Sequence, residues 1–311
     1  MDNQEALKAL ERMNLEYLYF RESDDYINSI RLSKLIDKNP INVLKYIKNH
    51  INNKEVKKKV DAISFKINRE DVFFADPAPL GLTGVAYSCI TGTYDKPKEP
   101  YYKDPHLTYM MFTDKIEHID KKNTSIWELK PVYCEGLSGG KNYINRYYKF
   151  HPFELFQGYN YSIYLDGNVQ IISDVSKLFS IARDSKTGIA MHKHAHMNCI
   201  YKNALWCEYN GRGNIDLIHK QVEKYKREGF PDNFGLLEAT IIVVDLHNQN
   251  AKNLMNQWWT EFIDCGSGRD QISLPYILWK NGFTVDDVGI LGNDEYHNPK
   301  FRIYEHQGKL F

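Results

Sequence analysis

Beyond residue 80 the chain alternates short apolar runs with amphipathic segments, and this alternation constrains the fold more than any other feature. The apolar runs, rich in aromatic and β-branched residues, predict strands at residues 84–91, 107–113, 125–129, 161–165 and 237–246. Apolar residues at helical spacing predict helices at residues 215–228, 251–263 and 270–280. Strands that alternate with helices are typical of an α/β domain with a mainly parallel central sheet.

The first 80 residues follow a different pattern and are predicted to be helical. Asn39 followed by Pro40 is typical of a helix start, and apolar residues then recur at helical spacing up to Ile51. The stretch 76–81 contains two prolines and a glycine, which predicts a linker. We therefore expect a helical N-terminal segment at residues 1–80 and an α/β domain at residues 81–311.

Composition narrows the class of protein. Forty basic and forty acidic residues cancel, which argues against nucleic acid as the main partner. The five cysteines are scattered without a Cys-x-x-Cys pair, and the polar N-terminus lacks the apolar core of a signal peptide. No run approaches the ~18 apolar residues of a membrane span. We expect a cytoplasmic protein, in which the basic run 54–59 is either a solvated helix face or a peripheral membrane contact.

The apolar run 161–165 ends in Asp166, Gly167 and Asn168. The glycine allows a sharp turn, so oxygen atoms of Asp166 and Asn168 are expected at the end of a buried strand. Mg²⁺ and Mn²⁺ prefer oxygen ligands and share them with substrate phosphates. The spacing is that of the Asp-x-Asp metal motif of nucleotide-sugar glycosyltransferases, with Asn in the last place. Because Asp-Gly-Asn is also an ordinary turn, the motif alone leaves both interpretations open.

Several motifs occur in an order that resembles one known family. They lie at residues 88–95, 109–114, 145–149, 165–168, 193–201 and 269–276. In this order, from about Val85 to the C-terminus, they resemble a glycosyltransferase-like domain family shared by bacteria and plants, formerly described as a domain of unknown function. The family is distantly similar to glycogenin-like transferases. The helical N-terminal segment lies outside the resemblance.

The resemblance implies a GT-A-like fold, a Rossmann-type α/β sandwich that binds a nucleotide-diphosphate sugar with Mn²⁺ or Mg²⁺. The loop that carries Thr91 and Tyr94 would face the nucleotide. Asp95 and Asp114 follow predicted strands and would contact the base or the ribose, and the alternative for each is a helix N-cap. The acceptor would be a saccharide or a lipid-linked glycan, and we expect a role in bacterial surface glycan synthesis.

The same resemblance assigns the metal and phosphate ligands. Asp166 would hold the metal ion, together with Asn168 and the late residue His306. Lys309 would contact phosphate, as the late lysine of glycogenin-like transferases does. Arg146 and Lys149 are three residues apart, so a helix would place them on one face, where they either contact the donor phosphates or form surface charge.

Catalytic roles are expected for Asp270, Gln271 and His194. Asp270 opens a predicted helix, so it is either a helix-terminal cap or a charge that acts on the transferred sugar or the acceptor. If Asp270 has both roles, the Asp270→Asn variant is expected to melt close to the parent, because Asn also caps a helix, and to lose turnover. The chain departs from the family pattern at residues 194–197, where His-Ala-His-Met replaces the expected His-Pro-x-Arg.

Two other functions compete with the transferase. His192, His194 and His196 alternate, and on a strand they would share one face and hold Zn²⁺ for a metal-dependent hydrolase. A non-catalytic sugar-binding module is the second alternative, because the pair Trp258 and Trp259 would suit stacking on a sugar. Helical placement of this pair predicts that at least one of the two indoles lies in the core.

Overall fold

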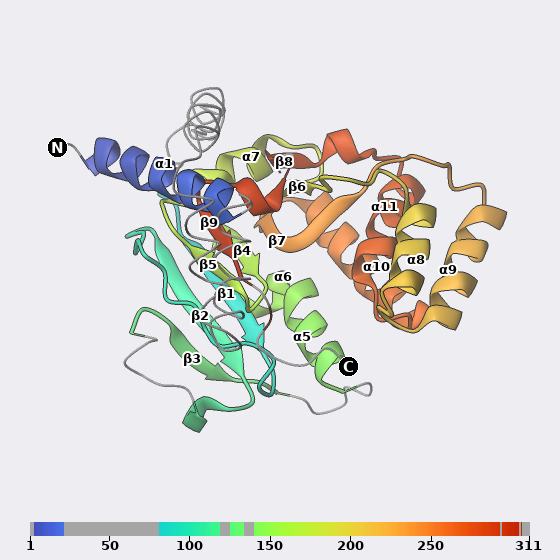
Figure 1. The fold of residues 1–311 in the computed structure, drawn as a ribbon, viewed down its shortest axis with the longest axis horizontal. Coiled ribbons are helices and arrows are strands. Elements are labelled where there is room, and N and C mark those ends of the chain that lie inside the picture. The colour runs from blue at the N-terminus through green and yellow to red at the C-terminus, as the bar shows by residue number, and fades with distance from the viewer. Residues whose placement is uncertain are drawn as a thin grey trace, which may run out of the picture.

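The computed structural model describes residues 3–21, 81–118, 125–133, 140–292, 294–304 and 306. The strands are β1 (Gly84–Ile90), β2 (Leu107–Thr113), β3 (Glu128–Pro131), β4 (Tyr161–Leu165), β5 (Val169–Ile171), β6 (Ile189–Lys193), β7 (Leu237–Asp245), β8 (Gly289–Gly292) and β9 (Phe301–Ile303). The helices are α1 (Asn3–Arg21), α5 (Lys141–Phe150), α6 (Pro152–Leu155), α7 (Leu178–Asp184), α8 (Ile200–Tyr209), α9 (Ile215–Arg227), α10 (Gln249–Cys265) and α11 (Asp270–Lys280), with 3-10 turns η2 (Ile116–His118), η4 (Val285–Asp287) and η5 (Glu295–His297) (Figure 1).

A seven-stranded sheet in the order β3-β2-β1-β4-β7-β6-β8 forms the centre of the molecule. The pairs β3–β2, β2–β1, β1–β4 and β6–β8 are parallel, whereas β7 runs antiparallel to both β4 and β6. A small second sheet pairs β5 with β9. The expected α/β architecture with a mainly parallel central sheet is therefore confirmed.

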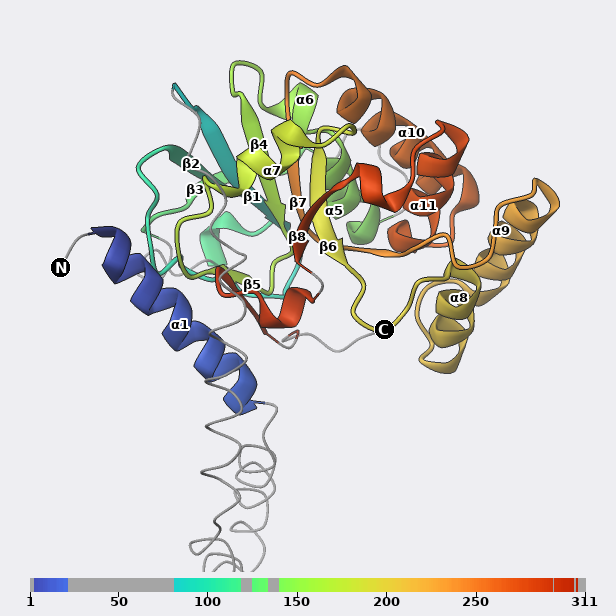
Figure 2. The same cartoon turned by 90° about the horizontal axis from the view of Figure 1, so that it is seen from above.

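Both faces of the central sheet are covered. Alternate residues of β1, such as Val85 and Ala86, enter different apolar clusters, because side chains of a strand alternate between its faces. One cluster includes residues of α5, α8, α9, α10 and α11, and the other includes residues of α7, β5 and β9 (Figure 2). The strands β1 and β4 are buried along their whole length, as expected for central strands of a doubly covered sheet.

Helix α1 forms buried hydrogen bonds with residues 299–301, near the other end of the chain. The carboxylate of Glu11 accepts a hydrogen bond at 2.6 Å from Nζ of Lys300, and both side chains are buried. Nδ2 of Asn14 donates to the carbonyls of Pro299 and Phe301 at 3.0 and 2.9 Å. These contacts hold α1 against the segment between η5 and β9 (Figure 2).

Most of the predicted elements agree closely with the structure. The expected strands at 107–113 and 161–165 and the helix at 270–280 coincide with β2, β4 and α11. The expected helical character of the N-terminal segment is confirmed for Asn3–Arg21, while the predicted helix start at Asn39 lies outside the described residues. No helix in the described part of the chain is long and apolar enough to cross a membrane.

The strand predicted at residues 125–129 is wrong by three residues at its start. β3 begins at Glu128, which pairs with Met110 of β2. The preceding residues are bonded elsewhere: the Ile126 N–H donates to the carboxylate of Glu99 at 2.6 Å, and the Trp127 indole donates to the carbonyl of Lys98 at 3.0 Å. These bonds hold residues 126–127 against the loop after β1, so the two residues do not pair with β2.

Candidate active site

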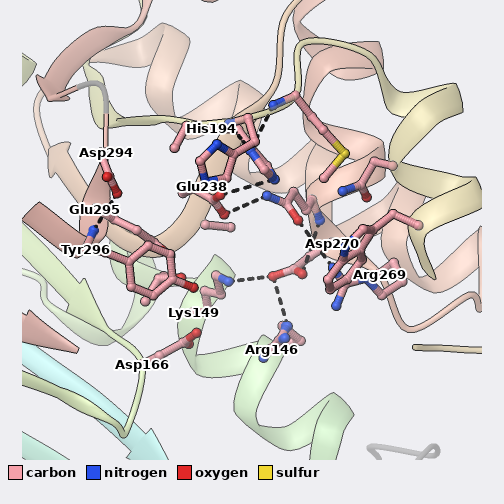
Figure 3. A pocket seen from close by; sticks show the side chains of 18 residues that line it. Arg146, Lys149, Asp166, His194, Glu238, Arg269, Asp270, Asp294, Glu295 and Tyr296 are labelled. Carbon is pink, nitrogen blue, oxygen red and sulfur yellow. Dashed lines mark hydrogen bonds and ion pairs between the residues drawn. The ribbon is translucent and has the colours of Figure 1, made fainter. Parts of the chain in front are cut away.

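A pocket of about 440 Å³ opens at one edge of the central sheet (Figure 3). Strand β4 ends there at Asp166, and because β7 is antiparallel to β4, its first residues lie at the same edge. The Asp166 N–H donates to the carbonyl of Thr240 at 2.9 Å, which joins the two strands at the pocket. Helices α5, α8 and α11 and the turn η5 supply other walls. Ligands of open α/β sheets bind at this carboxyl edge, in pockets of roughly 300–1,000 Å³.

Asp270 is held by two cations on one wall of the pocket. Its Oδ2 forms ion pairs with Nε of Arg146 at 2.9 Å and with Nζ of Lys149 at 2.5 Å. Both cations come from α5, which confirms that a helix places them on one face. Burial opposes the ionisation of Asp270, but the two cations outweigh burial and hold the pKa of the carboxyl well below its ordinary value. Burial lowers the pKa of Lys149 in spite of Asp270.

The position of Asp270 is set by the turn between α10 and α11. Gly266 ends α10 with a left-handed φ of 61°, a conformation that glycine adopts without strain. Asp270 is the first residue of α11, its Oδ1 accepts from the N–H of Gln271 at 3.1 Å, and its carbonyl accepts from the Trp258 indole at 2.8 Å. Arg269, the residue in the N-cap position, makes no side-chain cap bond. Asp270 is thus a buried ion-pair centre in addition to a helix-start residue.

His194 lies just past the end of β6 with its ring orientation fixed. Nδ1 accepts hydrogen bonds from the N–H groups of His196 and Met197 at 3.1 and 3.2 Å. An acceptor Nδ1 places the proton of the neutral ring on Nε2. Nε2 faces Oε1 of Glu238 at 3.4 Å (Figure 3). Burial, followed by the charge of His196, lowers the pKa of His194, which favours this neutral ring.

The three histidines of the alternative zinc hydrolase do not lie on one strand face. The register of β6 against β7 shifts between Ala190 and His192, and β6 ends at Lys193, so the three rings do not share one strand face. His192 is fully buried beside Nδ2 of Asn298 at 2.8 Å, whereas His194 and His196 line the pocket. Burial lowers the pKa of His192 to about 3. Across the described residues, no group of three or more His, Cys, Asp or Glu side chains is placed to hold a metal ion.

Two glutamates that the sequence analysis did not identify line the pocket. Glu238 is the second residue of β7, and its Oε2 accepts from Nε2 of Gln271 at 2.7 Å. Burial raises the pKa of Glu238 to about 7. Glu295 in η5 is buried, and burial together with the charge of Glu238 raises its pKa well above the ordinary value. The sequence signal for Glu238 is a carboxylate inside the apolar run that begins at Leu236.

Asp166 and Asn168 lie at the end of β4, as expected. Oδ1 of Asp166 accepts a hydrogen bond from the Tyr164 hydroxyl at 2.8 Å, and Asp166 faces the pocket. Nδ2 of Asn168 donates to the carbonyl of Tyr304 at 2.7 Å. Oδ1 of Asn168 is buried and has no hydrogen-bond partner among the described residues. The Asn168 amide nitrogen is therefore held by a hydrogen bond, whereas its buried oxygen accepts none from the described residues.

The loop after β1 packs against the turn after β4. A Cβ on Gly167 would lie 2.7 Å from Cγ1 of Ile90 and 3.2 Å from Cβ of Asp95, so this close approach requires glycine. Asp95 contacts Nδ1 of His306 at 3.0 Å, and the ring of His306 lies 4.6 Å from that of Tyr94.

Asp114 organises the same loop. Its Oδ1 accepts from the N–H of Gly92 at 2.7 Å, next to Thr91, and this contact ties the end of β2 to the end of β1. The structure thus brings two sets of the predicted residues together. His194, Arg146, Lys149, Asp166, Asp270 and Gln271 line the pocket. Thr91, Tyr94, Asp95, Asp114, Asn168 and His306 belong to the adjoining loops, and Lys309 lies outside the described residues. The roles assigned to all of these residues stay predictions.

The candidate site is thus a polar pocket at the carboxyl edge of a mainly parallel α/β sheet. The chain belongs to the TOD1/MUCI70 glycosyltransferase-like domain family, whose sequence model matches residues 54–290. The family expected from the ordered motifs is confirmed. The match begins before the predicted domain boundary at residue 81 and ends before the C-terminus.

The solved structures that the chain matches include glycosyltransferases with very different sequences. The bifunctional glycosyltransferase WbbM is 13% identical, with a TM-score of 0.42, and the match covers 86% of this chain and 59% of that one. The galactosyltransferase LgtC, solved with donor and acceptor sugar analogues, is 10% identical, with a TM-score of 0.38 and coverage of 73% and 88%. The mannosyltransferase Ktr4p from S. cerevisiae is 10% identical, with a TM-score of 0.35 and coverage of 66% and 67%. No curated protein sequence matches the chain.

Proposed function

We propose that the protein is a glycosyltransferase that moves a sugar from a nucleotide-diphosphate donor to a saccharide or lipid-linked acceptor, assisted by Mn²⁺ or Mg²⁺. The observation that carries the proposal is the carboxylate of Asp166 at the end of β4, which faces a pocket of about 440 Å³ at the carboxyl edge of the sheet. Family membership supports the same reaction class. The proposed setting is the cytoplasm, with bacterial surface glycan synthesis as the process.

The residues at the end of β4 fit a hard divalent cation. Asp166 offers a carboxylate, and the buried Oδ1 of Asn168 lacks a hydrogen-bond partner among the described residues. His306, now in contact with Asp95, is the third proposed ligand. A site with so few protein ligands suits Mg²⁺ or Mn²⁺, which complete their coordination with substrate phosphates and water. Such an ion stabilises the negative charge that develops on the diphosphate leaving group.

The wall around Asp270 supplies fixed positive charge. Arg146 and Lys149 together carry two positive charges and Asp270 one negative charge, so this trio has a net charge of +1. Its charges are already oriented by their mutual contacts, and preorganised charge of this kind lowers a barrier without reorganisation during the reaction. We assign the trio to the side of the pocket that receives the donor phosphates, and Tyr94, Asp95 and Asp114 to the loops that receive the nucleoside.

The alternatives lose support from the geometry of their key residues. The zinc hydrolase needs His192, which is buried beside Asn298. The sugar-binding module needs the indoles of Trp258 and Trp259, but Trp258 is fully buried and donates its N–H to the carbonyl of Asp270. At least one tryptophan was expected in the core, and this expectation is confirmed.

Isothermal titration with UDP and GDP, each with and without Mn²⁺ or Mg²⁺, tests the proposed function. We expect micromolar binding that requires the metal. Asp166→Asn should weaken metal-dependent binding at least tenfold, because a neutral amide lacks the Coulomb attraction of a carboxylate. Asp232→Asn, at an exposed position, is the matched control and should bind like the parent. Absence of nucleotide binding with either metal would refute the proposal.

A further inference from the structure

Five carboxyl side chains line the pocket, and each has different partners. Asp270 is neutralised by Arg146 and Lys149, and Asp294 is paired with His297. Asp166 accepts from Tyr164 and is assigned to the metal ion above. Glu295 is almost fully buried, and Glu238 keeps 15% of its side chain exposed at the pocket wall.

The contacts of Glu238 orient its carboxylate without neutralising it. Oε2 accepts from the Gln271 amide at 2.7 Å, and Oε1 faces Nε2 of His194 at 3.4 Å. Neither contact brings a positive charge to Glu238, because the Gln271 amide is neutral and His194 is held in its neutral form by the N–H groups that reach Nδ1. Among the described residues, no Lys or Arg nitrogen forms an ion pair with Glu238. A carboxylate has about four lone-pair sites, so two contacts leave room for a substrate hydroxyl.

We propose that Glu238 is the general base of the transfer reaction, an inference that rests on the glycosyltransferase function proposed above. The acceptor hydroxyl oxygen forms the new bond to the anomeric carbon as the bond between that carbon and the diphosphate oxygen breaks. The hydroxyl proton passes to the Glu238 carboxylate, and the bonding electron pair leaves with the nucleoside diphosphate. Gln271 and His194 act as positioning residues, because they hold the two oxygens of Glu238.

The charged surroundings of Glu238 are consistent with this role. A general base works best when its pKa lies near the working pH, and burial raises the pKa of Glu238 to about 7. The groups that face it from the neighbouring elements are His194 after β6, Lys149 of α5, Arg269 before α11, and Asp294 and Glu295 at η5. Asp270, which the sequence suggested as the base, has a pKa held far below this range.

The test compares parent and Glu238→Gln, which keeps the shape of the side chain. Hydrolysis of UDP-sugars and GDP-sugars, with water as the acceptor, is measured from pH 5 to pH 9 in Mn²⁺, and UDP and GDP binding is measured by calorimetry. We expect parental activity to rise through about pH 7. The variant should lose roughly 10²- to 10⁴-fold in rate and lose this rise, with nucleotide binding unchanged. Glu238→Asp should keep the rise at a reduced rate, and Glu223→Gln, exposed on α9, should match the parent.

Three results overturn the inference in distinguishable ways. Parental hydrolysis rates and an unchanged pH profile in Glu238→Gln would show that another group takes the proton. Loss of nucleotide binding in Glu238→Gln would show that Glu238 supports the site instead of acting on the acceptor. A parent that binds neither UDP nor GDP with metal would refute the proposed function itself, and the assignment of Glu238 would fall with it.

Discussion

Asp270 and Glu295 are carboxyl side chains of the same pocket, each with 4% of its surface exposed, and their pKa values are shifted in opposite directions. Two cations from α5 hold the pKa of Asp270 far below its ordinary value. Among the residues that the structure describes, no cation forms an ion pair with Glu295, and burial with the charge of Glu238 raises its pKa well above the ordinary value. Burial alone therefore does not decide the charge of a side chain. The neighbouring cation decides it.

The two walls consequently have different chemical uses. On the wall of Asp270, two ion pairs lower the pKa of a carboxyl. On the wall of Glu238 and Glu295, burial raises the pKa of both carboxyls, that of Glu238 to about 7. One wall suits the recognition of an anionic group, and the other suits proton transfer. The same substitution, from carboxylate to amide, should therefore have opposite consequences on the two walls.

Asp270→Asn should give the largest effect. It leaves Arg146 and Lys149 buried without their counter-ion, and breaking a buried pair typically costs about 3–5 kcal/mol. We expect the free energy of unfolding at pH 7 to fall by this amount in urea titrations. The buried pairs thus change the expectation, drawn from the sequence, that this variant melts close to the parent. Asp184→Asn removes an exposed pair with Arg183 and should cost less than about 1 kcal/mol. Equal losses in the two variants would contradict the comparison.

Glu238→Gln should raise the free energy of unfolding by an intermediate amount, and the size of this gain should depend on pH. The folded-state pKa of about 7 lies above the ordinary glutamate pKa of 4.5, so the folded protein binds more protons than the unfolded chain between these values. Parental stability should therefore fall as pH rises from about 4.5 to 7. In the variant this part of the fall disappears, which makes it more stable than the parent at pH 8 by on the order of 2–3 kcal/mol. Urea titrations at pH 5 and pH 8 check this, and parallel profiles for the two proteins would contradict it.

Glu295→Gln should have the smallest effect at neutral pH. Because burial raises the pKa of Glu295 well above its ordinary value, it favours the neutral carboxyl, and the substitution puts a neutral amide of similar shape in its place. We expect the free energy of unfolding to change by about 1 kcal/mol or less, although the side chain is as buried as that of Asp270. Thermal melts of both variants at pH 7 measure the contrast. A loss for Glu295→Gln as large as that for Asp270→Asn would show that Glu295 is ionised in the folded protein.

The central strands were predictable because their sequences are nearly continuous apolar runs. β1 and β4 are buried on both faces and β2 along most of its length, so apolar residues occupy most positions of these strands. β3 was misplaced because its first predicted residues bond to the loop at Lys98 and Glu99. Such contacts between distant segments leave no local pattern in the sequence.

The pocket was predictable only in part, for a reason that lies in strand direction. Asp166 and Asp270 follow local signals, a strand end and a helix start. Glu238 is the second residue of β7, and in a parallel strand that position would lie at the opposite edge of the sheet. Because β7 runs antiparallel to β4, Glu238 lies beside the pocket. Apolar runs show that a strand exists but not which way it runs, so Glu238 could not be placed from the sequence.

The contacts between α1 and the segment before β9 have a consequence for biosynthesis. Glu11 and Lys300 are separated by 289 positions, and Lys300 lies three residues beyond η5, which carries the pocket residues Glu295 and Tyr296. At a synthesis rate of about 5–20 residues per second, roughly 15–60 seconds pass between the synthesis of Glu11 in α1 and that of Lys300. During that interval its buried polar side chains remain in water. The wall that carries Glu295 is therefore among the last parts to assemble, and an incomplete chain holds no finished pocket.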